Sequence, residues 1–92
     1  MKNEWELQQE SAVLCGKEAQ TILNSNAWQT AKVSIKGDII AKLENQEILN
    51  NNEQLVELVR ELQSFNKISD RFEQIVSEGQ FAEHELKLRE DF

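Results

Sequence analysis

"LVELVRELQSFNKISDRFEQIVSEG", residues 55–79, is the longest regular stretch of the chain and decides its fold. Apolar residues recur there at alternating intervals of three and four, which is the spacing of one helical face. The pattern predicts a long helix over about 53–78 that ends at Gly79, where a left-handed residue would close it. The row consists of Leu55, Leu58, Leu62, Phe65, Ser69, Phe72 and Val76, of which only Ser69 is polar.

Further apolar residues make this helix wider than the seam of a two-stranded coiled coil. Val59, Ile68 and Ile75 are interpreted as a flanking row, and Val56 lies further round. One apolar face can pack on a neighbouring helix of the same chain, so a second row predicts a second contact. We expect another copy of the chain to cover part of it.

The preceding segment predicts a second helix over about 27–46. Gly37 lies in its middle, and a strand over "KVSIKGDII" is the alternative interpretation. The helix is favoured because no other segment offers a strand partner. Ser25 or Asn26 is expected to cap this helix, and Asn51 or Asn52 the next one. Its apolar face consists of Trp28, Ala31, Ile35, Ile39 and Leu43, widened by Val33 and Ile40.

The two ends of the chain are less regular. Residues from about 4 to 23 predict an N-terminal helix, with the first ten residues frayed or forming a separate short piece. Residues 80–92 read as a short C-terminal helix or a mobile tail. The fold class is therefore all-α: one domain over 1–92, in which helices 27–46 and 53–78 form an antiparallel hairpin with the N-terminal helix packed across it. Residues 1–10 and 80–92 are the segments expected to be flexible.

Composition excludes several classes of function. The net charge of −7 argues against a general nucleic-acid binder, so we expect no strong direct binding of nucleic acid. Cys15 is the only cysteine, and no internal disulfide can form. No apolar run approaches the roughly 20 residues of a membrane span, and the polar start does not resemble a signal peptide. We expect an intracellular protein without a membrane partner.

No motif for catalysis, cofactor binding or metal binding is present. His84, the only histidine, is expected to be exposed near the C-terminus, and Cys15 to be a small buried apolar residue. One histidine and one distant cysteine do not supply the three or four ligands of a metal site. Lys32 and Lys36 could contact phosphates, but the favoured interpretation is that they lie on the solvent side of a packed helix. The sequence therefore predicts a protein that is not an enzyme and has no cofactor.

The chain resembles a group of small bacteriophage proteins encoded near DNA-packaging and head genes. The resemblance covers residues 17–86, and Gly37 departs from it. It implies a phage origin and a non-enzymatic task in packaging or head assembly, with the host-cell cytoplasm or the virion as the place of action. The residues that carry it are Ala19, Ile22, Leu23, Trp28, Ala31, Ile35, Ile39, Leu43, Asn50–Asn52, Leu55, Leu58, Leu62, Ile68, Phe72, Ile75, Gly79 and Ala82.

The expected function is interaction with proteins. We expect a homo-oligomer that acts as an accessory factor in virion assembly or genome packaging, with a phage packaging or head protein as partner. A role like that of a small terminase subunit is its concrete form. The alternative is an acidic inhibitor of a host nucleic-acid enzyme or defence system. The candidate interface residues are Trp5, Val59, Ile68, Ile75 and Phe81.

Overall fold

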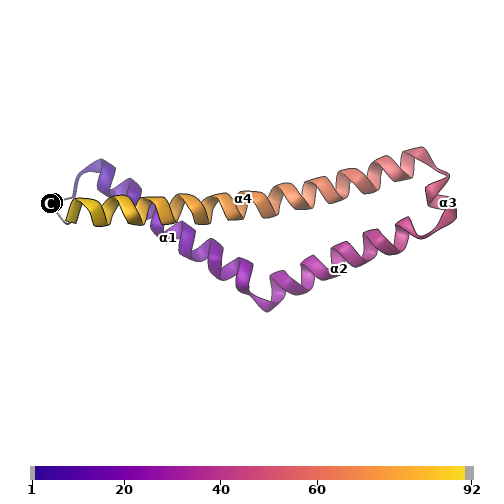
Figure 1. The fold of residues 1–92 in the computed structure, drawn as a ribbon, viewed down its shortest axis with the longest axis horizontal. Helices are drawn as coiled ribbons and strands as arrows, with labels where there is room; N and C mark the ends of the chain where they lie inside the picture. The colour runs from indigo at the N-terminus through magenta and orange to yellow at the C-terminus, as the bar shows by residue number, and fades with distance from the viewer. Residues whose placement is uncertain (1, 91–92) are drawn as a thin grey trace. The chain divides into compact units, whose positions relative to one another are not determined.

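Residues 2–90, the part of the chain that the computed structural model describes, fold into helices (Figure 1). These are α1 at Glu4–Asn24, α2 at Asn26–Leu43, α3 at Gln46–Leu49 and α4 at Asn52–Glu90. No β-strand occurs within residues 2–90, so the all-α class is confirmed and the strand alternative for "KVSIKGDII" is wrong. No helix in this part of the chain is both long and apolar enough to cross a bilayer.

Short polar side chains mark the points where the helices begin. The Asn3 Oδ1 atom accepts a hydrogen bond of 2.8 Å from the backbone N–H of Glu6, and Asn45 and Asn51 cap α3 and α4 in the same way. Ser25 caps α2 through its Oγ atom. Such caps satisfy amide groups that have no partner within their helix. The predicted capping roles of Ser25 and Asn51 are therefore confirmed.

The N-terminal helix begins earlier than the sequence predicts. α1 starts at Glu4, directly after its Asn3 cap, so most of residues 1–10 are helical and not a frayed or separate piece. Lys2 forms an ion pair with Glu10, and this hydrogen bond and the carboxylate charge raise the pKa of Lys2. Both side chains are largely exposed, so the cap contributes more to this helix start than the ion pair does.

The prediction that the long helix ends at Gly79 is wrong, because α4 continues to Glu90. No glycine within residues 2–90 has the positive φ of a helix-terminating residue. Gly79 is buried against Gly16 of α1 instead, so it serves packing and not helix termination. The residues that the sequence assigns to a short helix or tail over 80–92 belong to α4 as far as Glu90. Residues 91 and 92 lie outside the described part.

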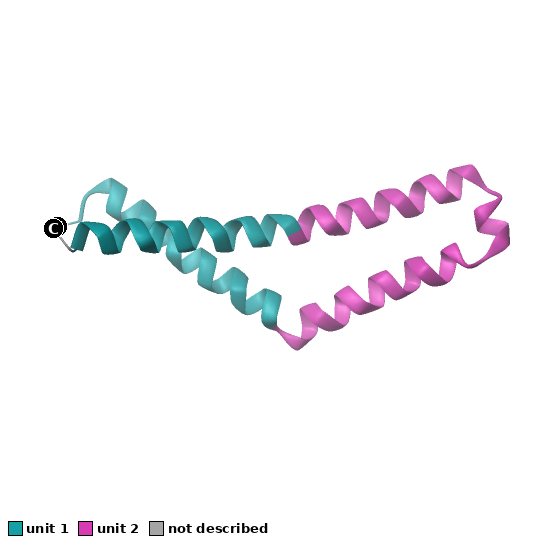
Figure 2. Ribbon diagram, viewed as in Figure 1, with its two compact units in different colours: residues 1–24, 70–92 teal, residues 25–69 magenta. Residues whose placement is uncertain are grey.

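The chain divides into two compact units (Figure 2). Unit 1 comprises Met1–Asn24 and Asp70–Phe92, and unit 2 comprises Ser25–Ser69. Unit 1 thus contains α1 and the C-terminal part of α4, whereas unit 2 contains α2, α3 and the N-terminal part of α4. The boundary between α1 and α2 falls at the Ser25 cap, while α4 contributes to both units without interruption.

In unit 2 the predicted apolar row of α4 is the covered face. Leu58 is buried, and Phe65 is half-buried with its ring stacked on Trp28 of α2 at a centroid distance of 5.8 Å. On α2, Ile39 is buried, and the side that faces α4 includes half-buried Lys32. We call the two facing rows of unit 2 the seam. It consists of Trp28, Lys32, Ile35, Ile39 and Leu43 from α2, and Leu55, Leu58, Leu62, Phe65 and Ser69 from α4.

Unit 1 is held together by small residues. Gly16 and Ala19 of α1 are buried, as are Gly79 and Ala82 of α4. The distance between two packed helices depends on the side chains at their contact, and these residues have no side chain or only a methyl group. The two backbones therefore meet directly at this point.

Candidate interaction surface

Many large apolar side chains within residues 2–90 are exposed. Within residues 2–90 only four hydrophobic residues are buried, namely Ala19, Ile39, Leu58 and Ala82, whereas thirteen large hydrophobic residues are exposed. Single exposed apolar residues are ordinary, but gathered ones mark contact sites for other molecules. The exposed apolar residues of the two units are therefore the candidate contact sites for other molecules.

Trp5, a candidate for an intermolecular contact, is engaged within unit 1. Its ring is half-buried, and the Arg89 guanidinium carbon lies 4.1 Å from the ring centroid. An arginine over a tryptophan face is an attractive cation–π arrangement. The structure thus gives one face of the Trp5 ring a partner from the C-terminal end of α4.

Val59 and Ile68 are equally exposed but do not lie in one row. Val59 is 51% exposed and Ile68 is 53% exposed. The two residues are nine positions apart, which is about two and a half turns of an α-helix. They therefore point in opposite directions from α4, one on each side of the seam. The interpretation of both as members of one flanking row is incorrect in this respect.

The last two candidates, Ile75 and Phe81, differ from each other in exposure. Ile75 is half-buried in unit 1, and its carbonyl oxygen lies beside the Gly16 backbone. Phe81, at 65% exposure, is the most exposed aromatic residue among the large hydrophobic side chains of residues 2–90. Ile75 belongs to the helix contact of unit 1, whereas Phe81 is available to a partner.

Three further exposed residues in unit 2 were not among the sequence candidates. Val33 and Ile40 of α2 are 71% and 56% exposed, and Val56 of α4 is 47% exposed. Each of them directly follows a residue of the seam in the sequence. An apolar residue directly after a residue of the covered row is a pattern visible in the sequence. This pattern could have identified these three residues together with Val59.

The side of unit 2 that carries Ile68 forms a shallow groove. Its volume is about 560 Å³. Ile35, Phe65 and Ile68 supply its apolar lining, and the remaining residues are polar or charged: Glu57, Arg60, Glu61 and Ser64. The two carboxylates of this groove have an arginine among their neighbours. The groove has the character of a solvated surface channel.

The residues with reactive or metal-binding side chains are dispersed. Cys15 is exposed, so the prediction that it is buried is wrong. The covered side of α1 runs through Gly16 and Ala19, and Cys15 is turned about 100° away from Gly16. His84 is exposed as predicted. Within residues 2–90 no three side chains of His, Cys, Asp or Glu come together in a way that could hold a metal ion.

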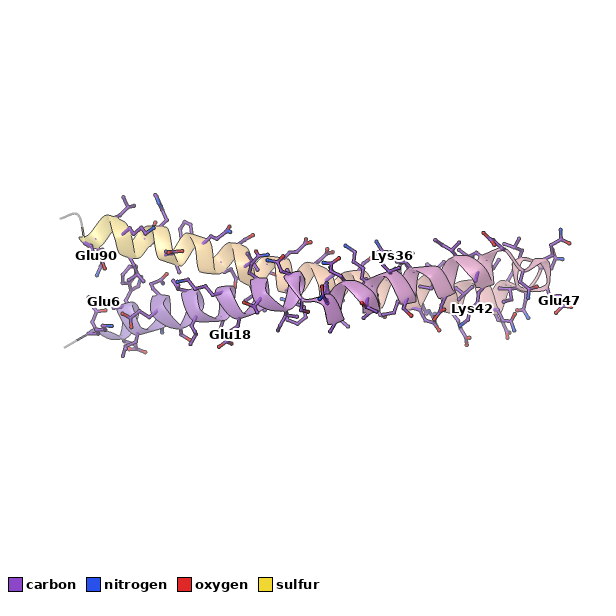
Figure 3. The ribbon with its side chains drawn as sticks, turned by 90° about the horizontal axis from the view of Figure 1, so that it is seen from below. Glu6, Glu18, Lys36, Lys42, Glu47 and Glu90 are labelled. Atoms are coloured by element: carbon purple, nitrogen blue, oxygen red, sulfur yellow. The ribbon has the colours of Figure 1, made fainter. Side chains whose placement is uncertain are left out.

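The lysines of α2 occupy different environments. Lys36 and Lys42 are exposed, as are Glu18 of α1 and Glu47 of α3 (Figure 3). Lys32 is half-buried in the seam, whereas Lys36, one turn further along the same side of α2, is exposed. Lys36 and Lys42 are therefore the lysines of α2 that are open to solvent.

Comparisons with protein-family models, with curated proteins and with solved structures found no match to this chain. The candidate surface is therefore defined by the chain's own exposed apolar side chains and charges.

Proposed function

We propose that this protein is a non-enzymatic interaction protein that works as a homo-oligomer. The observation that carries the proposal is the exposure of large apolar residues on both units, while only four hydrophobic residues are buried in residues 2–90. A two-helix unit can cover one face of each helix and leaves the other apolar residues in water. Association with further helices removes that surface from water and stabilises so small a chain.

The assembling element in this proposal is the antiparallel hairpin of α2 and α4, with α1 packed on the C-terminal part of α4. Support comes from the Trp28–Phe65 stack in unit 2 and from the glycine contact in unit 1. Hairpins of this kind complete their cores by pairing with other helices. Val59 and Phe81, both exposed, are the sequence candidates best placed to contribute to such pairing.

We assign the protein to virion assembly or genome packaging in a bacteriophage, as an accessory factor that binds a packaging or head protein. The support for this assignment is the sequence resemblance over residues 17–86. The infected host cell, or the virion, is then its place of action. A net charge of −7 favours a protein partner over direct contact with DNA, in a role like that of a small terminase subunit.

A second function is favoured by the acidic charge. Glu57 and Glu61 line an open groove on unit 2, with Ile35 and Ile68 as its apolar lining. Carboxylates beside an apolar strip could occupy the basic cleft of a host nucleic-acid enzyme, as an inhibitor does. In that case the protein would bind its target as a monomer or dimer.

The two functions are separated by one experiment. The purified protein is analysed by size-exclusion chromatography with light scattering at concentrations from one to one hundred micromolar, alone and with purified packaging and head proteins of the phage. A concentration-dependent homo-oligomer that binds one of these proteins supports the first function. A monomer or dimer that binds none of them, but inhibits a host nuclease in a separate activity assay, supports the second.

A further inference from the structure

We propose that a second copy of this chain docks on one face of unit 2, here called the aliphatic face, which carries Val33, Ile40, Val56 and Val59. The inference rests on the proposed function, because it names the surface through which the homo-oligomer forms. The product is a dimer with two-fold symmetry, in which the hairpins of two copies stack into a four-helix arrangement.

All four residues turn toward the same side of unit 2. Each directly follows a seam residue, and one step along an α-helix is a rotation of about 100°. α2 and α4 run in opposite directions within unit 2 (Figure 1). Because the two helices are antiparallel, a residue that directly follows a seam residue turns toward the same face of unit 2 in both α2 and α4. Residues that directly precede a seam residue, such as Ile68 before Ser69, turn toward the other face.

The groove on unit 2 agrees with this assignment of faces. Glu57, Glu61 and Ser64 each directly precede a seam residue of α4, and all three line the groove together with Ile68. Val56 and Val59 do not line this groove. Unit 2 thus has on one side a groove lined by Glu57, Glu61 and Arg60, and on the other side four exposed aliphatic side chains, of which Val56 also lies beside Glu57 and Arg60.

The charges indicate which of these two faces accepts an identical copy. Among the positions that directly follow a seam residue, the charged ones are Lys36, Glu44 and Asp70, which leave a net charge of −1. Among the positions that directly precede one, Asp38, Glu57 and Glu61 oppose a single lysine, Lys42, which leaves a net charge of −2. Every copy carries a net charge of −7, so two acidic faces would repel each other. The four residues that define the aliphatic face carry no charge, so this penalty is smaller there.

The chain exposes more surface than a compact protein of its mass. The chain exposes 7273 Å², whereas a compact monomeric protein of its mass, 10.7 kDa, exposes roughly 5,500 Å². The excess is larger than the roughly 800 Å² that each partner buries in a standard-size protein interface. Association with a second copy removes part of this excess from water.

The test uses two residues of matched exposure on the same helix. Val59→Glu places a charge in the aliphatic face, and Ile68→Glu places the same charge in the opposite face. Dissociation constants are measured by analytical ultracentrifugation of the full chain, with circular dichroism to verify the helix content of each variant. We expect Val59→Glu to raise the dissociation constant at least about tenfold and Ile68→Glu to leave it within about twofold, because only the first charge becomes buried.

Other outcomes identify which proposal fails. If Ile68→Glu dissociates the oligomer while Val59→Glu does not, or if both do so equally, the assigned face is wrong and the homo-oligomer stands. If the wild-type chain is monomeric at one hundred micromolar, the homo-oligomer itself is wrong. Should Val59→Glu lose helix content, Val33→Glu on α2 replaces it, and an intact dimer of that folded variant overturns the inference.

Discussion

Gly16 of α1 and Gly79 of α4 touch through their backbones. A Cβ atom built on Gly16 would lie 2.9 Å from the Cα of Gly79, and one built on Gly79 would lie 2.8 Å from the Cα of Gly16. The second of these positions is also 2.9 Å from the carbonyl oxygen of Ala12. Backbone atoms cannot rotate out of the way as the end of a side chain can. Unit 1 therefore requires glycine at both positions.

Replacing Gly79 with alanine is expected to destabilise the protein, although alanine is the better helix former. The added methyl group forces α1 and α4 apart, and overpacking of this kind costs about 1–3 kcal/mol. Gly37→Ala is the matched control, because a Cβ at Gly37 meets nothing within 4 Å. It should stabilise the chain by roughly 0.5–1 kcal/mol. Urea unfolding followed by circular dichroism measures both changes, and equal gains in stability would show that the glycine contact does not form.

Phe65→Ala is expected to cost about 2–4 kcal/mol, because it removes a seam side chain and its stack on Trp28. Ile68→Ala, three residues further on α4, should cost less than about 1 kcal/mol in the unfolding of the monomeric chain because Ile68 is exposed. Urea denaturation at a low protein concentration compares the two variants. Similar losses for both would mean that the seam lies elsewhere on α4.

The contact between Arg89 and Trp5 is expected to stabilise the protein by roughly 0.5–1 kcal/mol, the usual range for a cation–π pair near the surface. A double-mutant cycle with Arg89→Gln and Trp5→Leu isolates the interaction from the other losses of each substitution. Additive effects of the two substitutions on the free energy of unfolding would be inconsistent with the contact.

Cys15 should react readily with a thiol reagent in the folded protein, since its side chain is exposed on α1. We expect a labelling rate in buffer within about tenfold of the rate in concentrated urea, because exposure governs access to a thiol of ordinary reactivity. The reaction of the thiol with a chromogenic disulfide measures both rates. Strong protection in buffer would place Cys15 inside a contact of the native assembly.

Binding to duplex DNA should be weak at physiological salt. With a net charge of −7, the protein has no excess of cations to displace counterions from DNA. Fluorescence anisotropy of a labelled duplex, titrated with protein at two salt concentrations, tests this. A sub-micromolar complex that weakens with salt would contradict the prediction.

The covered face of α4 could be predicted from the sequence, because it repeats at helical spacing and includes large residues such as Leu58 and Leu62. The role of Gly79 could not be predicted in the same way. A glycine after a helical pattern usually ends the helix, and only a second glycine on another helix makes it a point of close approach. Nothing in the order of residues indicates that Gly16 lies opposite Gly79. That relationship belongs to the packing of two segments that are distant in sequence.

The candidate surface could be predicted in part. Hydrophobicity alone identified Val59, Ile68 and Phe81 as apolar residues outside the covered row, and all three are exposed. The direction in which each side chain points depends on whether the residue follows or precedes a seam residue. Val59 follows one and Ile68 precedes one, so the two point to opposite sides. Trp5 could not be assigned because its partner, Arg89, lies at the far end of the chain. The prediction that Cys15 is buried fails because its neighbour Gly16, and not the cysteine, occupies the covered side of α1.

The position of the two tryptophans has a consequence for how the folding of this protein can be observed. Trp5 belongs to unit 1 beside a guanidinium group, and Trp28 belongs to unit 2 against a phenyl ring. With one tryptophan replaced by phenylalanine, the fluorescence of the other reports on a single unit. Coincident unfolding transitions in the two variants would establish that the two units unfold cooperatively. Separate transitions would establish that each unit has its own melting temperature. The chain thus carries an intrinsic optical probe for each half.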